Sequence, residues 1–348
     1  MATINFTELF ATITSATTGS WATIDLTSLG VPNNAVVVVL AEHKTDGTPA
    51  LCGVRKVGSS LARYLNLHEP EGGGSTSTVM HVQSDATASI QYYKGDSATV
   101  FTLLGYYGSG ITYTEEMIGY ELSGATGWTQ TGFGQNDTVF EVVCLNEEAG
   151  NTAVNMGCRE FGSSLARYYD IHEAEPSGIN SYTSYVQSNA SGDVQLYREN
   201  LTFVPFYYVV GYFSSNIQLE EAFDDCTPTS DATWRTNVAI NTGGEDCVGL
   251  IACMHQSNGS GENTGARGGA SAVARYWLEH ESETDQYTGD TLPVLVDSSG
   301  YYDTYFGDVS DALFYCLGYL YDTGGAPAAV APTSVLYGPL CGPFAGPI

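Results

Sequence analysis

Short apolar segments separated by turn-forming residues run along the whole chain. Val, Ile, Tyr, Thr and Phe dominate these segments, and Gly, Asn, Asp or Ser lie between them. Residues 87–93 and 193–197 alternate polar and apolar positions with a period of two, so one face of each strand should be solvated. The segment 59–64 is the one stretch compatible with a short helical turn. In the first third, the pattern predicts strands near residues 4–10, 21–27, 35–44, 50–57, 62–69, 77–84, 88–94 and 98–107.

This pattern occurs three times. Trp21, Trp128 and Trp234 are separated by 107 and 106 residues, and a similar short strand opens before each of them. A period near 106 residues is the size of a whole domain, not of a solenoid repeat. About eight strands in that length favour a sandwich of two β-sheets, with the jelly roll as one such fold. Three similar domains in one chain could mimic a trimer or line up as a rod.

The sequence therefore predicts an all-β chain of three tandem homologous β-sandwich domains. The expected boundaries are 1–109, 110–215 and 216–322. Residues 323–348 are rich in Gly and Pro and are expected to form an extended arm, which we expect to lie on a neighbouring chain.

The most regular part of each repeat is a motif with two arginines. The central copy spans residues 157–173, and every copy keeps Arg, seven residues, Arg-Tyr, three residues and His-Glu. These arginines make up six of the 11 basic residues in the chain. The candidate structural residues are Arg55, Arg63 and Glu69; Arg159, Arg167 and Glu173; and Arg267, Arg275 and Glu281.

Two interpretations of the arginines remain open at this stage. An arginine can donate to a carboxylate or to backbone carbonyls while its stem packs on aromatic rings. Each pair could therefore form an ion pair with the glutamate of its own motif, or a carbonyl clamp, inside one domain. Alternatively, one arginine of each pair could cross to the neighbouring domain or subunit.

Three histidines precede the glutamates of the motif, at His68, His172 and His280. Brought together on a pseudo-threefold axis, they could bind a metal. The plainer interpretation is a half-buried histidine on a strand in each domain, and it leads us to predict no metal and no cofactor.

No catalytic signature stands out. The serine pairs at 59–60 and 163–164 are not kept in the third copy, which reads Ala270-Ser271, and no Gly-x-Ser-x-Gly elbow occurs. Acidic turns expected at 220–221 and 224–225 could hold Ca²⁺, but the chain has no EF-hand spacing. We therefore expect a protein that is not an enzyme.

The charge composition of the chain excludes some classes of binding partner. The chain has 39 acidic and 11 basic residues, a net charge of −28, and 24 tyrosines. This field repels nucleic acids and anionic membranes, so neither is an expected partner. No apolar run approaches the roughly 18 residues that span a bilayer.

The eight cysteines are expected to be mostly free, buried thiols. In the repeat alignment, Cys158 occupies the position of Val54 and Ala266, as a small apolar residue would. Cys226 and Cys341 lie outside the shared pattern and are the candidates for a disulfide. No Cys-x-x-Cys motif indicates a zinc ribbon.

The repeat resembles repeats in structural proteins of tailed bacteriophages. The resemblance rests on Gly-Val-Arg-x3-Ser-Ser-Leu-x-Arg-Tyr-x3-His-Glu, on Val-Gln-Ser-Asp-Ala and on a terminal Leu-Leu-Gly-Tyr-Tyr, and it covers the chain to about residue 322. It implies a β-sandwich virion component, either a capsid decoration protein or part of a tail or fibre. The third copy departs most, with Gly269-Ala270 where the others have Gly-Ser.

The leading hypothesis is therefore a non-enzymatic structural protein on the exterior of a virion, assembled in the host cytoplasm. Its expected partners are other virion proteins or copies of itself. Two alternatives remain: a carbohydrate-binding adhesin or receptor-binding protein that contacts a surface glycan, and the subunit of an extracellular filament.

Overall fold

The computed structural model describes residues 4–14, 17–44, 48–68, 74–122, 124, 126–146, 154–172, 180–199, 205–214, 216–240, 247–255, 261–279, 287–297, 299–308 and 312–323. Within them the chain is built almost entirely of strands, which form six four-stranded antiparallel sheets. No helix in this part of the chain is long and apolar enough to cross a membrane. The arm at 323–348 lies outside the described residues, apart from residue 323.

The first domain contains two sheets that pack face to face. The inner sheet, whose strands contact the neighbouring domains, has the strand order β1-β8-β3-β6, and the outer sheet has the order β2-β7-β4-β5. A short 3-10 helix, η1 (Thr27–Leu29), follows β2. The strands are β1 (Phe6–Thr12), β2 (Trp21–Asp25), β3 (Val36–His43), β4 (Ala50–Lys56), β5 (Leu65–Leu67), β6 (Thr76–Gln83), β7 (Ser89–Lys94) and β8 (Val100–Tyr107).

The second and third domains repeat this arrangement strand for strand. The second domain contains β9 (Tyr113–Glu121), β10 (Gly127–Gly132), β11 (Val139–Asn146), β12 (Val154–Glu160), β13 (Tyr168–Ile171), β14 (Asn180–Gln187), β15 (Asp193–Arg198) and β16 (Phe206–Phe213). The third contains β17 (Ile217–Asp225), β18 (Thr233–Ala239), β19 (Cys247–His255), β20 (Glu262–Gly268), β21 (Tyr276–Glu279), β22 (Thr288–Val296), β23 (Tyr301–Phe306) and β24 (Ala312–Asp322).

The strand order identifies each domain as a jelly roll. Numbered within one domain, the sheets read 1-8-3-6 and 2-7-4-5 in all three copies. Eight antiparallel strands divided in this way between two sheets are the jelly-roll arrangement. The prediction of three tandem all-β sandwiches is confirmed.

The burial pattern follows the position of each strand in its sandwich. Strand β15 alternates half-buried and buried residues along its whole length, as the period of two in the sequence predicts. Strands β3 and β6 are instead buried at every residue. Both faces of β6 are covered because one faces the core of its own domain and the other faces the neighbouring domains. This explains why a strand with the polar sequence Thr-Ser-Thr is fully buried.

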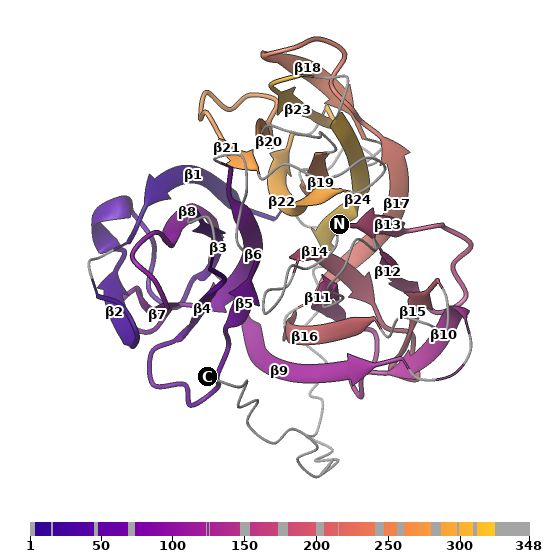
Figure 1. The fold of residues 1–348 in the computed structure, drawn as a ribbon, viewed down its shortest axis with the longest axis horizontal. Coiled ribbons are helices and arrows are strands. Elements are labelled where there is room, and N and C mark those ends of the chain that lie inside the picture. Colours follow the sequence, from indigo (N-terminus) through magenta and orange to yellow (C-terminus); the bar gives the residue numbers. More distant parts are fainter. Residues whose placement is uncertain are drawn as a thin grey trace.

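The three domains are arranged around a common centre (Figure 1). Strands β6, β14 and β22 each lie at one edge of the inner sheet of their domain, and each packs against the other two. The first strand of each domain packs against the domain before it in the ring. Strand β9 contacts β6, β17 contacts β14, and β1 of the first domain contacts β22 of the third. The chain therefore forms a closed pseudo-threefold ring, which is the trimer-like alternative and not the rod.

One local prediction was wrong. The segment 59–64 forms no helical turn but an extended loop between β4 and β5. Its backbone carbonyl at Leu61 accepts a hydrogen bond from Arg55 Nη1 at 2.9 Å, which holds the loop against the outer sheet. This contact across the sheet is one of the hydrogen bonds that hold the segment in its extended shape.

Candidate functional site: the interdomain arginines and the central axis

The first arginine of each pair lies on the outer sheet and stacks on the repeated tryptophan. The guanidinium carbon is 4.0 Å from the ring centroid in every copy, a cation–π distance. In the second domain, Arg159 also donates from Nη1 to the carbonyl of Leu165 at 2.8 Å and from Nε to Gln195 at 3.0 Å. The three stacked pairs are Arg55 with Trp21, Arg159 with Trp128 and Arg267 with Trp234.

The second arginine of each pair is fully buried. Arg167 is only 2% exposed, and it donates from Nη2 to the carbonyl of Tyr185 at 3.0 Å and from Nη1 to that of Cys158 at 3.3 Å. Its counterparts donate in the same way to the carbonyl 18 residues further on. These contacts are Arg63 to His81 at 3.1 Å and Arg275 to Pro293 at 3.0 Å.

The same buried arginines cross to the next domain. Each forms an ion pair, through Nη1, with a glutamate on the first strand of that domain. The N–O distances are 3.4 Å for Arg63–Glu115, 2.5 Å for Arg167–Glu221 and 2.9 Å for Arg275–Glu8. The last pair joins the third domain back to the first, so the three ion pairs close a ring.

Each glutamate of these pairs is placed by an irregularity in its strand. The register of the first strand shifts immediately after Glu8, Glu115 and Glu221, as expected of a β-bulge, which can re-aim a side chain. The same carboxylate oxygen also accepts a backbone N–H from the residue after the first arginine of the preceding domain. These bonds come from Lys56 at 2.5 Å, Glu160 at 2.8 Å and Gly268 at 2.8 Å.

The expected carboxylate partners Glu69, Glu173 and Glu281 lie outside the described residues. The structure places Glu8, Glu115 and Glu221 on the buried arginines instead, and the sequence analysis proposed none of these as a partner of an arginine. A signal for them existed, because an acidic residue recurs at the same position of the first strand in each copy. The carbonyl clamp inside each domain and the crossing to the next domain are therefore both present.

A single carboxylate joins the three domains at their centre. Asp290, on β22, is fully buried, and its Oδ1 accepts the backbone N–H of Thr183 at 2.7 Å and that of Thr291 at 2.7 Å. Its Oδ2 accepts the backbone N–H of Val79. Val79, Thr183 and Thr291 occupy the same position in the three repeats, so Asp290 lies on the pseudo-threefold axis. Burial raises the pKa of Asp290 to about 7, although the three amide hydrogen bonds oppose the rise.

A second buried network, between the first two domains, has no counterpart in the third repeat. The backbone N–H of His81 donates to Glu141 Oε1 at 3.0 Å, and His81 Nδ1 lies 3.1 Å from the same oxygen. The Tyr113 hydroxyl donates to Glu141 Oε2. Burial and the Glu141 carboxylate raise the pKa of Tyr113, so its hydroxyl keeps the proton that it donates. The residues equivalent to His81 are Tyr185 and Pro293.

Two of the three motif histidines approach one another near the axis. The ring centroids of His68 and His172 are 6.1 Å apart, whereas His280 lies outside the described residues. Burial and the neighbouring His172 lower the pKa of His68 to about 4, so its ring is neutral at physiological pH. In the part of the chain that the structure covers, no three His, Cys, Asp or Glu side chains are grouped to hold a metal.

The motif serines make local turns. The hydroxyls of Ser59, Ser163 and Ser271 each accept the backbone N–H two residues further on, at 3.3 Å. This is the geometry of a serine that stabilises a turn. The acidic pairs at 220–221 and 224–225 were expected in turns, but they lie within strand β17, so that expectation was wrong.

The described cysteines are all free and buried. They are Cys52, Cys144, Cys158, Cys226, Cys247, Cys253 and Cys316. The proposed exception Cys226 is therefore a free thiol, and Cys341 lies outside the described residues. Burial raises the pKa of Cys316 to about 12, so this thiol is protonated and unreactive at neutral pH.

Comparison with known proteins identifies no family. No family model matches the sequence, and no curated protein matches it. Among solved structures, a tandem pair of CBM22 domains from Paenibacillus barcinonensis matches with 11% identity and a TM-score of 0.17, covering 62% of this chain and 98% of that one. A chain of the lipid-containing bacteriophage PM2 matches with 10% identity and a TM-score of 0.12, covering 92% of this chain and 94% of that one.

Proposed function

We propose that this chain is a non-enzymatic structural protein of a bacteriophage particle, acting as a single-chain counterpart of a trimer. It would lie on the particle exterior, as a capsid decoration protein or a tail appendage. Its partners would be other virion proteins or further copies of itself. The resemblance of the repeat to those of tailed-phage structural proteins supports this assignment, and the following geometry agrees with it.

The observation that carries the proposal is the closed ring of ion pairs. Arg275 of the third domain returns to Glu8 of the first, at 2.9 Å, and Arg63 and Arg167 make the corresponding forward contacts. One of the two arginines that every repeat keeps therefore fixes its domain against the next. A pseudo-threefold body of this kind suits a position of threefold or near-threefold symmetry on a larger assembly.

The distribution of charge fits the same role. The chain carries a net charge of −28, but its six motif arginines are stacked or buried between its own domains. The remaining surface is strongly acidic and would repel nucleic acid, so it suits a position outside a nucleocapsid.

Localisation on purified particles tests the proposal. Gold-labelled antibody against the full chain should decorate intact virions in electron micrographs, with labels on the capsid or the tail. Labels that stay with the unassembled host-cell fraction while the particles remain bare would overturn it. Removal of residues 324–348 should then reduce incorporation of the chain into particles, because the arm is expected to contact a neighbour.

Carbohydrate binding is a second candidate, favoured by a separate observation. Each domain carries a half-exposed aromatic cluster around its stacked arginine. In the second domain, Trp128 and Tyr168 flank Tyr197, and the two tyrosine rings are stacked with their centroids 4.3 Å apart. Flat aromatic faces beside a guanidinium can pack on sugar rings and hydrogen-bond their hydroxyls. The three clusters would give three glycan-binding sites, one on each domain, and so a multivalent protein.

A glycan array separates the two candidates. Binding of the full chain to a defined glycan, lost when Tyr168 and Tyr197 and their counterparts are changed to alanine, would support an adhesin. The Tyr106→Ala variant, which changes a partly buried tyrosine away from the clusters, serves as the control. An array without signal would remove this second candidate and leave the assembly role.

A further inference from the structure

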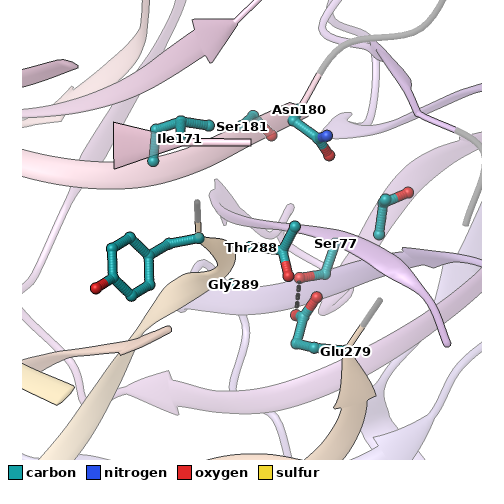
Figure 2. A pocket seen from close by; sticks show the side chains of 9 residues that line it. Ser77, Ile171, Asn180, Ser181, Glu279, Thr288 and Gly289 are labelled. Carbon is teal, nitrogen blue, oxygen red and sulfur yellow. Dashed lines mark hydrogen bonds between the residues drawn. The ribbon is translucent and has the colours of Figure 1, made fainter. Parts of the chain in front are cut away.

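A small cavity lies where the three domains meet. Its volume is about 10 Å³, and it is lined by residues from all three domains (Figure 2). The lining includes Thr76, Asn180 and Thr288, which share one position of the repeat, and Ser77 and Ser181, which share the next. Gly289 also lines it and directly precedes the axial Asp290. The cavity therefore lies on the pseudo-threefold axis, next to the carboxylate that joins the domains.

Glu279 is the charged residue of this cavity. It is only 1% exposed, and its Oε1 accepts hydrogen bonds from Ser77 Oγ at 2.5 Å and from Trp277 Nε1. Its Oε2 has no hydrogen-bond partner among the described residues, and the same is true of Ser181 Oγ. The equivalent residues in the other repeats are Leu67 and Ile171. An aliphatic residue occupies this position in the other two domains, so the carboxyl group is particular to the third domain.

The neighbouring carboxylates already have partners. Glu42 lies 3.0 Å from Lys44 Nζ, and Asp290 accepts three backbone N–H groups. Glu279 forms no ion pair in the described part of the chain. A buried carboxylate with an unmatched oxygen is strongly unfavourable unless a proton or a cation balances it.

Size and chemistry point to a cation. A cavity of about 10 Å³ holds one particle the size of a water molecule. The side chains around it offer a carboxylate, hydroxyls and an amide oxygen, which are the ligands that hard cations such as Na⁺ and Ca²⁺ prefer. We propose that the axial cavity binds one hard metal cation through Glu279 Oε2 and the surrounding oxygens, so that the ion ties the three domains together.

This site does not depend on the role of the chain in a particle. Burial, together with the nearby Asp290 and Glu42 carboxylates, raises the pKa of Glu279 to about 8. Below that pH a proton competes with the metal, so binding should be tighter at pH 8.5 than at pH 6.

Thermal unfolding of the full chain tests the proposal. The protein is dialysed against a chelator into choline buffer at pH 8.5, and then titrated with NaCl or CaCl₂ at constant ionic strength, with MgCl₂ for comparison. We expect a saturable rise in Tm with NaCl or with CaCl₂, and the salt that acts identifies the ion. Without metal, Glu279→Gln should melt at or above the wild type; at saturation this order should reverse, because the variant has no charge to bind the ion.

Two further variants keep the test decisive. Ser181→Ala leaves the charge intact and should raise the midpoint of the titration about tenfold, the loss of roughly one ligand contact. Glu121→Gln, an exposed carboxylate on β9, should behave as the wild type. If neither salt raises Tm, or if the wild type and Glu279→Gln respond equally, the cavity holds only water beside a protonated glutamate, and the proposal is wrong.

Discussion

Arg167 shows why the motif keeps two arginines where one could serve. The guanidinium of Arg159 stacks on Trp128 at the half-exposed surface, so part of its hydration is retained. Arg167 is buried, and its charge is balanced by Glu221 of the next domain and by backbone carbonyls. Desolvating a guanidinium is costly, and only good geometry with several acceptors compensates for it. The two arginines therefore have different roles. Arg159 holds a loop of its own domain, and Arg167 binds the next domain.

The Arg167→Met change should destabilise the protein strongly. It leaves Glu221 buried and without its ion-pair partner, which typically costs about 3–5 kcal/mol. Arg159→Met is the matched control; it removes a half-exposed stacking interaction and should cost about 1 kcal/mol. Unfolding in urea, followed by tryptophan fluorescence, measures both. Equal losses for the two variants would mean that burial does not distinguish the arginines.

The buried Glu279 should make the protein less stable as the pH rises. Burial raises the pKa of Glu279 from 4.5 to about 8, so the folded protein holds this proton more tightly than the unfolded chain does. The resulting stabilisation is complete below about pH 4.5 and is lost as the pH rises through about 8. In metal-free buffer, the Tm of the wild type should therefore fall relative to that of Glu279→Gln between pH 6 and pH 9. A difference between the two proteins that stays constant with pH contradicts the shift.

At the scale of the element, the glycine that opens each motif sets the distance between two segments. A Cβ on Gly157, in β12, would lie 1.9 Å from the carbonyl oxygen of Arg167, and Gly53 and Gly265 are equally crowded. The backbone that carries the second arginine therefore passes directly over this glycine. The motif Gly-x-Arg and the later Arg-Tyr thus belong to one packing unit.

Gly157→Ala tests this close approach. The added methyl group must displace the Arg167 backbone, and overpacking of this kind costs about 1–3 kcal/mol. Gly132→Ala, on β10 of the same domain, has only Asp193 Oδ1 near the new atom, at 3.6 Å, and should change stability by less than about 1 kcal/mol. Urea unfolding of both variants gives the comparison. A loss no larger at position 157 than at position 132 would refute the packing argument.

The periodicity of the strands and the repetition of the sequence predicted most of the fold. The alternation at residues 193–197 predicted a half-exposed strand, and β15 alternates as expected. The jelly roll remained one option among sandwiches, because strand order depends on which edges meet and leaves no local pattern. The segment 59–64 was misjudged because its shape depends on a hydrogen bond from Arg55, a contact across the sheet that local propensity does not encode.

The site was predicted in part. The motif arginines were singled out because they recur in an acidic chain, and crossing to a neighbour was one of the two interpretations. Their partners were missed because each lies in another domain: Glu115 is 52 residues from Arg63, and Glu8 is 267 residues from Arg275. The axial residues Asp290 and Glu279 break the repeat, so a search for shared positions passes over them. A comparison of the three copies shows both as carboxylates that the other copies lack, along with others such as Glu141.

For the whole molecule, a single chain can do what three identical subunits cannot. Only one side chain fits on a threefold axis, and here it is Asp290, which accepts one N–H from each domain. The equivalent residues in the other repeats are Thr78 and Tyr182. Three aspartates at this point would repel one another, so the differences between repeats allow a tighter centre than exact symmetry would.

Closure of the ring is the central claim, and a double-mutant cycle on its last contact tests it most directly. Glu8→Gln and Arg275→Met would be made singly and together, and the free energy of unfolding measured in urea. We predict a coupling free energy of about 1.5 kcal/mol or more, because the two side chains touch across the junction of the first and third domains. A coupling below about 0.5 kcal/mol, the value for sites that do not touch, would show that the ring is open.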